Sequence, residues 1–133
     1  MSQGTATFDH QPPRILIVED EPILALTLEE LLVEDGFAIA GLASSLDKAL
    51  AIIESGACDA AILDTNLAGV NVGPAAVALT ARGVPFLILS GNLPNQQNSA
   101  LAGAPYLQKP CRNDRIMQVL RSILEITECD AKK

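Results

Sequence analysis

Three carboxylates, one hydroxyl and one ammonium group stand directly after short apolar runs of this chain. They belong to Glu19, Asp20, Asp64, Ser90 and Lys109. Carboxylates that crowd together disfavour one another's ionisation, and a bound cation offsets this repulsion. Mg²⁺ prefers oxygen ligands, and proteins usually hold it with one or two carboxylates together with a phosphate oxygen. If the fold gathers these side chains, they indicate a magnesium site that acts on a phosphoryl group.

The chemistry open to such a site is phosphoryl transfer to a carboxylate. Asp20 and Asp64 are the natural direct ligands of the metal, and Glu19 would reach it through a water. A carboxylate beside a metal can attack phosphorus and form an aspartyl phosphate. The metal and Lys109 would neutralise charge on the phosphoryl oxygens, and Ser90 could donate a hydrogen bond to one of them.

Five short apolar runs predict the strands that must position these groups. Each run is too short for a helix and is bounded by turn-forming or charged residues, which favours a buried strand. The runs cover residues 14–18, 37–43, 60–63, 85–89 and 106–108.

Amphipathic segments between the runs predict helices. The first begins at Pro22, which the first helical turn tolerates, and stops at Gly36. The second is capped by Ser44 or Ser45 and closed by Gly56. A loop over residues 68–74 leads to the third, which passes through Val77, Ala78 and Ala81 to Gly83. The last carries Ile116, Val119, Leu120, Ile123 and Leu124 on one stripe and ends near Thr127. The polar segment 91–104 has few apolar anchors, so a helix there would be short and poorly held.

Strands that alternate with helices predict an α/β fold with a parallel sheet covered on both faces. Right-handed crossovers place every strand-to-helix loop at the same edge of such a sheet. Ligands of open α/β sheets bind beyond the carboxyl ends of the strands. The polar residues that end the strands should therefore share one rim.

Four motifs in this order resemble the response-regulator receiver family. They are IVEDEP at residues 17–22, ILDTNL at 62–67, ILSG at 88–91 and YLQKP at 106–110, and the resemblance runs from about Arg14 to Glu128. It implies a flavodoxin-like, doubly wound five-stranded sheet in the order 2-1-3-4-5, which is the strand order of the family's chemotaxis member.

The resemblance also implies a role for each site residue. Asp64 matches the phosphoacceptor, and Glu19 and Asp20 match the acidic metal pair. Asn66 matches the position that binds the metal through its backbone carbonyl. Ser90 and Lys109 match the groups that contact the phosphate, and Ser90 and Tyr106 match the switch pair. Pro110 matches the residue that follows the lysine through a cis peptide.

The sequence departs from the family's pattern after Ser90. The polar stretch there, together with Gln108 before the lysine, resembles a receiver subgroup with an atypical fourth helix, which puts the coupled movement of Ser90 and Tyr106 in doubt. Cys111 stands where the family often has an aromatic residue.

Two other functions remain open at this point. Asp64-Thr-Asn66 faintly resembles the nucleophile loop of haloacid-dehalogenase-type phosphatases, although that family has a second aspartate where Asn66 stands. A receiver that binds partners without being phosphorylated is the second, and the intact acids and lysine argue against it. Taken singly, Glu19 and Asp20 could simply favour a helix N-terminus, Asp64 could cap a turn, and Lys109 could be a solvated surface residue.

Composition limits the remaining choices. The net charge of −7, from 9 basic and 16 acidic residues, disfavours direct binding to nucleic acid. The three cysteines lack metal-site or redox-pair spacing, and no apolar run is long enough to span a membrane. We expect a leader over residues 1–13, one receiver domain over 14–128 and a tail over 129–133, in the cytoplasm. The donor would be a sensor histidine kinase or a histidine phosphotransfer protein. The domain would catalyse only its own phosphorylation and dephosphorylation. It would either signal through protein contacts that include segment 91–104 and the last helix, or serve as a phosphate reservoir.

Overall fold

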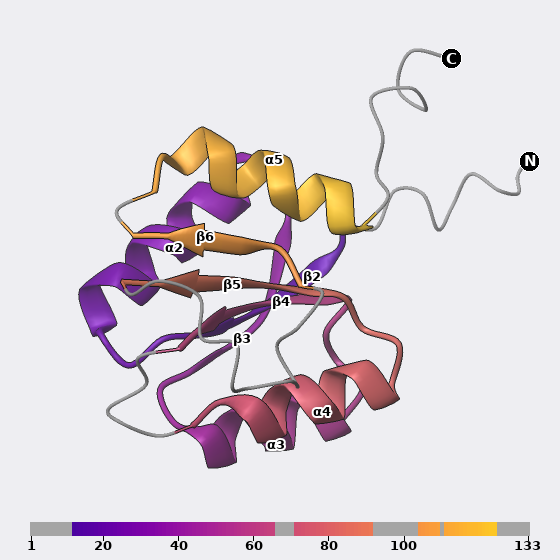
Figure 1. The fold of residues 1–133 in the computed structure, drawn as a ribbon. Helices are drawn as coiled ribbons and strands as arrows, with labels where there is room; N and C mark the ends of the chain where they lie inside the picture. Colours follow the sequence, from indigo (N-terminus) through magenta and orange to yellow (C-terminus); the bar gives the residue numbers. More distant parts are fainter. Residues whose placement is uncertain (1–11, 66–70, 92–103, 110, 125–133) are drawn as a thin grey trace, which may run out of the picture.

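The structure is a computed structural model, and it describes residues 12–65, 71–91, 104–109 and 111–124. Within these residues, nine elements follow one another, and strands and helices alternate from β2 to β5 (Figure 1). They are β2 (Arg14–Val18), α2 (Pro22–Glu34), β3 (Ala38–Ala43), α3 (Leu46–Glu54), β4 (Ala60–Asp64), α4 (Gly73–Ala81), β5 (Phe86–Ser90), β6 (Tyr106–Gln108) and α5 (Asn113–Leu124).

The strands form one parallel sheet in the order β3-β2-β4-β5-β6. Numbered among the strands alone, this is the predicted order 2-1-3-4-5, and the predicted α/β class is confirmed. β2, the first described strand, lies next to the edge strand β3, and β4 pairs with the other side of β2. The carboxyl ends of β2 and β4 are therefore neighbours, and this is the place where such sheets bind ligands.

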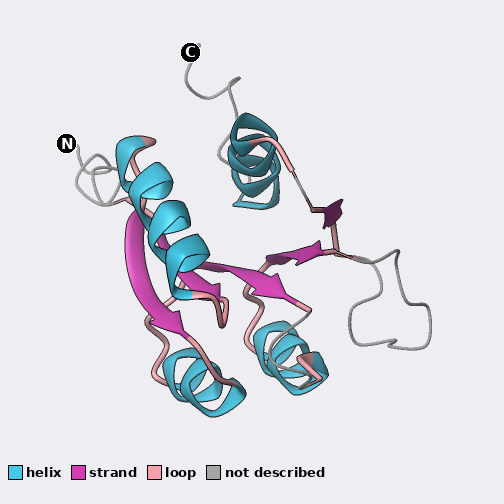
Figure 2. Cartoon of the chain, turned by 90° about the vertical axis from the view of Figure 1, so that its left-hand side faces the viewer, coloured by secondary structure: helices cyan, strands magenta, loops and turns pink. Residues whose placement is uncertain are grey.

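Helices cover both faces of the sheet, as Figures 1 and 2 show. Alternation of side chains along each strand divides the core in two. Leu16, Leu63 and Ile88 pack with α3 and α4 on one face. Ile17, Ile62 and Leu87 pack with α2 and α5 on the other. Because both sets are buried, the strands appear in the sequence as nearly continuous apolar runs.

Two predicted strands begin one residue late. The N–H of Phe37 donates to the carbonyl of Leu32 and closes the end of α2, so β3 begins at Ala38. Pro85 has no N–H for the ladder, and β5 begins at Phe86. The third helix begins inside the predicted loop, at Gly73, with Pro74 in its first turn.

The predicted helix boundaries hold at most of the other ends. Ser45, not Ser44, caps α3 by accepting a hydrogen bond from the N–H of Lys48 at 3.2 Å. Gly36, Gly56 and Gly83 follow the helices with positive φ angles, as expected of residues that end helices. The predicted end of the last helix at Thr127 and the segment 92–103 lie outside the described residues.

The outer face of α2 is unusually apolar. Leu28 and Leu32 of this helix are buried, but Ile23, Leu24 and Leu26 are exposed, Ile23 by 78%. Val77, which the sequence placed in the third helix, is likewise turned outward, because Ala75, Ala76 and Leu79 face the sheet. None of the described helices combines the length and the apolar character that crossing a membrane requires.

Candidate functional site

The candidate site lies at the carboxyl ends of the central strands. Asp64 is the last residue of β4, Ser90 is the last residue of β5, and Glu19 follows β2 directly. Lys109 follows β6. The predicted rim is therefore present, and it gathers these four residues from positions up to 90 apart in the chain.

Backbone hydrogen bonds extend the sheet to these positions. The N–H of Glu19 donates to the carbonyl of Ala43 at 3.0 Å, and the N–H of Lys109 donates to the carbonyl of Ser90 at 2.7 Å. Thr65, just beyond Asp64, donates to the carbonyl of Leu89 at 3.1 Å. Because each site residue stands on or next to a paired strand, the site rests on the rigid part of the fold.

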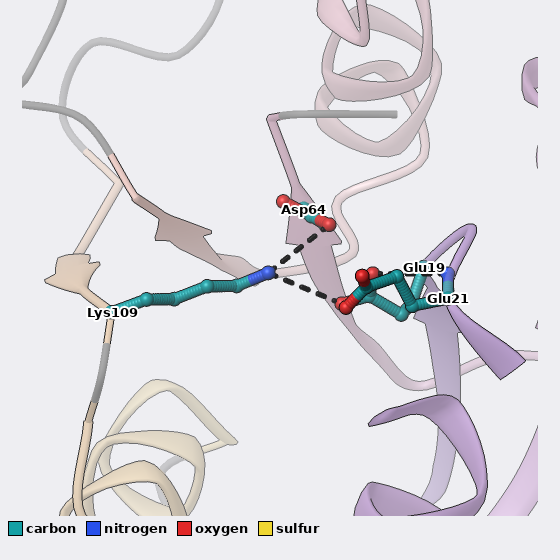
Figure 3. Close-up of polar contacts among 4 residues, drawn as sticks. All are labelled: Glu19, Glu21, Asp64 and Lys109. Carbon is teal, nitrogen blue, oxygen red and sulfur yellow. Dashed lines mark hydrogen bonds and ion pairs between the residues drawn. The ribbon is translucent and has the colours of Figure 1, made fainter. Parts of the chain in front are cut away.

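Lys109 bridges two buried carboxylates (Figure 3). Its Nζ lies 3.2 Å from Oδ2 of Asp64 and 3.4 Å from Oε1 of Glu19. The second oxygen of Glu19, Oε2, accepts a hydrogen bond from the N–H of Glu21 at 3.2 Å. Glu19 and Asp64 are only 4% and 2% exposed, so their charges depend on these partners.

Burial raises the pKa of Glu19 from 4.5 to about 7, and its hydrogen bond and repulsion with Asp64 act in the same direction. The N–H of Glu21 and the charge of Lys109 oppose the rise in pKa but do not cancel it. Near neutral pH, Glu19 is therefore divided between a protonated form that donates to Asp64 and an ionised form. Such a strained pair of acids is what a cation at this position would relieve.

The pKa of Lys109 lies above its ordinary value for the opposite reason. Burial alone would lower it, but the attraction of Asp64 and then of Glu19 outweighs burial. Lys109 therefore stays charged, held between the two acids at this rim.

Glu19, Asp20 and Asp64 can each direct one carboxylate oxygen so that all three oxygens lie within 4.8 Å of one another. Asp20 is half-buried at the entrance, and the other two acids form the floor. All three donors are hard oxygens, which fits Mg²⁺ and does not fit a metal that prefers sulfur or nitrogen. The predicted acidic group is thus brought together.

Ser90 and Tyr106, the predicted switch pair, are buried and half-buried, respectively. Ser90 is 1% exposed at the end of β5, the strand beside Asp64. Tyr106 is half-buried and packs against the core shared with α3 and α4. Asn66 and Pro110 lie outside the described residues.

Sequence reasoning missed two features of the site. The N–H of Glu21 holds Glu19 in place, and only the turn after β2 brings it there. An apolar cavity also adjoins the site, lined in part by Glu19 and Lys109. Neither feature has a signal in the sequence, since both depend on how α2 and α5 sit over the sheet.

The fold and the acidic rim together define an α/β domain of the receiver type, and comparison with known proteins agrees. The model of the response regulator receiver domain family matches residues 15–121. This chain belongs to that family.

Among curated proteins, the chain is 32% identical over 115 residues to the transcriptional regulatory protein TcrA of Mycobacterium tuberculosis. The match covers 83% of this chain and 45% of that protein, so the chain spans less than half the length of this relative.

The solved structures that share the fold of this chain include two receiver domains from other organisms. One is a CheY-like receiver domain from Methanospirillum hungatei, with a TM-score of 0.77, 24% identity, and coverage of 90% of this chain and 99% of that one. The other is the receiver domain of a sensor histidine kinase from Pseudomonas aeruginosa, with a magnesium ion coordinated in its active-site cleft. It has a TM-score of 0.74 and 26% identity, and the match covers 86% of this chain and 98% of that one.

Proposed function

We propose that this chain is a response regulator that accepts a phosphoryl group on Asp64 in a Mg²⁺-dependent reaction. The observation that carries the proposal is the bridge from Lys109 to Asp64 at 3.2 Å, beside two further acids whose oxygens can converge. A buried carboxylate held by a lysine and flanked by oxygen ligands is suited to attack phosphorus and to stabilise the charge that develops there.

Glu19, Asp20 and Asp64 would hold Mg²⁺, together with the backbone carbonyl of Asn66. When bound, the metal supplies positive charge that neutralises the phosphoryl oxygens and brings them to the carboxylate. Lys109 would exchange its contacts with Glu19 and Asp64 for one with the phosphoryl group. Ser90, at the end of the neighbouring strand, would contact the same group.

The phosphoryl donor would be a phosphohistidine of a sensor kinase or of a phosphotransfer protein. The oxygen of Asp64 forms the new bond to phosphorus while the bond from phosphorus to the histidine nitrogen breaks, and water later hydrolyses the aspartyl phosphate. Catalysis would be limited to these two steps on the domain itself. Phosphorylation would draw Ser90 toward the phosphate, with Tyr106 as its switch partner, and shift the population of a two-state element. The signal would leave by contact with another protein in the cytoplasm rather than by direct binding to nucleic acid.

The test is labelling by acetyl phosphate, followed as the mass of the intact protein. With Mg²⁺, the native chain should gain one phosphoryl group, and Asp64→Asn should gain none. Asp59→Asn is the matched control. Asp59 is an exposed acid that precedes β4, at the end of this strand opposite to Asp64, and it forms an ion pair with Arg14. Undiminished labelling of Asp64→Asn, or labelling unchanged by removal of Mg²⁺, would defeat the proposal.

A further inference from the structure

A cavity of about 450 Å³ lies between α2 and α5, beside the candidate site. Its walls are mostly apolar and come from both helices and from β5. The lining residues are Glu19, Leu24, Thr27, Leu28, Leu89, Lys109, Cys111, Asn113 and Ile116. The cavity has the size and the character of sites that take small molecules, which are mostly apolar with a few polar groups.

The cavity is closed on its inner side and open to solvent on its outer side. Its inner side is formed by Leu28, Leu89 and Ile116, which are buried in the core on this face of the sheet. Leu24 is 38% exposed at the mouth. Cys111, the smallest side chain of the wall, leaves room at the start of α5, and its polarisable sulfur suits contact with an aromatic ring.

The charges of the lining favour an occupant without charge. Lys109 and Glu19 stand at one end, where Nζ of Lys109 lies 3.4 Å from Oε1 of Glu19 and 3.2 Å from Oδ2 of Asp64, so the ammonium already has carboxylate partners. The carboxylate of Glu19 would repel an anion, and the ammonium of Lys109 would repel a cation. A neutral molecule would be repelled by neither side chain.

Two exposed polar groups stand at the mouth, on opposite walls. The hydroxyl of Thr27 donates to the carbonyl of Ile23 at 2.8 Å, so toward a ligand its oxygen acts as an acceptor. The amide of Asn113 can donate or accept. A ligand that is largely apolar and carries one N–H or O–H group would fit this arrangement. Aromatic heterocycles have this composition.

We propose that this cavity binds an uncharged aromatic small molecule that carries one hydrogen-bonding group. Because Glu19 and Lys109 belong to both the cavity and the candidate site, an occupant would also alter the surroundings of Asp64. That second effect rests on the proposed function, but binding itself does not, so the two can fail separately.

Indole is the probe, because the chain contains no tryptophan and indole emission can be followed directly. Titration with the protein should shift the emission of indole to the blue as it leaves water. Indole-3-acetate and tryptamine, which carry a negative and a positive charge on similar rings, should each bind at least about threefold more weakly. Bound indole should also slow alkylation of Cys111 by iodoacetamide, measured by peptide mapping, which separates it from Cys58 and Cys129.

Variants locate the binding. Cys111→Phe fills the cavity and should abolish the blue shift, and circular dichroism verifies that the variant folds. Leu24→Phe narrows the exposed mouth, carries less risk to folding, and should weaken binding about threefold or more. Val77→Phe is the matched control, since Val77 is an exposed apolar residue on α4, on the other face of the sheet, and it should leave the shift unchanged.

An absent blue shift and an unprotected Cys111 would overturn the proposal and leave the cavity to a side chain of a protein partner. An equal shift with Cys111→Phe and Leu24→Phe would also overturn it, because binding would then lie elsewhere. Tighter binding of either charged analogue would mean that the paired charges of Lys109, Glu19 and Asp64 do not select a neutral occupant.

Discussion

The interior of the sheet and the rim at its carboxyl ends follow opposite rules. In the interior, aliphatic side chains such as Leu79 and Ile53 are fully buried and bring stability through burial. At the rim, Glu19 and Asp64 are nearly as buried, but they are acids that repel each other. The rim is therefore maintained at a cost in stability, as sites that carry out chemistry usually are.

Substitution in the interior should give the largest loss of stability. Leu79→Ala removes a side chain with no exposure from the α4 face and should lower the free energy of unfolding by about 2–5 kcal/mol. Leu24→Ala, at the open mouth between α2 and α5, should cost less than about 1.5 kcal/mol, because less surface is lost and no closed cavity forms. Urea unfolding measures both, and equal losses would contradict the description of that region as open.

The rim should give the apo protein a stability that falls as pH rises. The pKa of Glu19 is about 7 when folded and 4.5 as the ordinary value, so the unfolded chain releases its proton first. The contribution of this group is complete below pH 4.5 and is lost as pH rises through 7, by on the order of 1–3 kcal/mol. Urea midpoints measured without metal between these pH values test the slope. In Glu19→Gln the slope should flatten, and a slope that survives would assign it to other groups.

Removal of a single acid from the rim should weaken metal binding without lowering the stability of the fold. Asp20→Asn should lower Mg²⁺ affinity by about tenfold or more, because a charged ligand becomes neutral. The apo form should be as stable as the native chain or more stable, since repulsion at the rim is relieved. Calorimetric titration with MgCl₂ and urea unfolding give the two results. A clear loss of apo stability would mean that Asp20 supports the fold.

The smallest effect should come from the ion pair that joins the far ends of α2 and α5. Arg121 pairs with Asp35 and lies 5.9 Å above the ring of Phe37. Both charged side chains are about one-third exposed, so Arg121→Ala should cost less than about 1 kcal/mol. A thermal-unfolding comparison with Arg121→Lys would separate loss of charge from loss of the stacked guanidinium. A loss as large as that of Leu79→Ala would place this pair with the interior.

Sequence patterns predicted the interior well, because buried strands and helices require apolar residues at regular spacing along the sequence. The strands at residues 14–18 and 106–108 match the predicted bounds. The second strand begins one residue late, the third ends one residue late, and the fourth is shifted by one residue at both ends, from 85–89 to 86–90. The backbones of Phe37 and Pro85 explain the two late starts. The strand order was an implication of the family resemblance, since no pattern in the chain encodes which strands are neighbours.

The rim was predictable in membership but not in arrangement. A residue that ends a parallel strand must lie at one edge, so Glu19, Asp64 and Lys109 could be grouped in advance. That Lys109 would bridge both acids depends on the length and direction of its side chain. The α4 helix shows the same limit, because a helix that is apolar all round does not reveal that Val77 faces outward.

The hydrogen bond from the N–H of Lys109 to the carbonyl of Ser90 ties two strand ends at 2.7 Å. Along the chain 18 residues separate Ser90 from Lys109, yet their main chains cannot move apart without breaking this hydrogen bond. A pull on either residue is therefore transmitted to the other without the intervening segment. A movement of Ser90 at the end of β5 would therefore also displace Lys109, which forms ion pairs with Glu19 and Asp64.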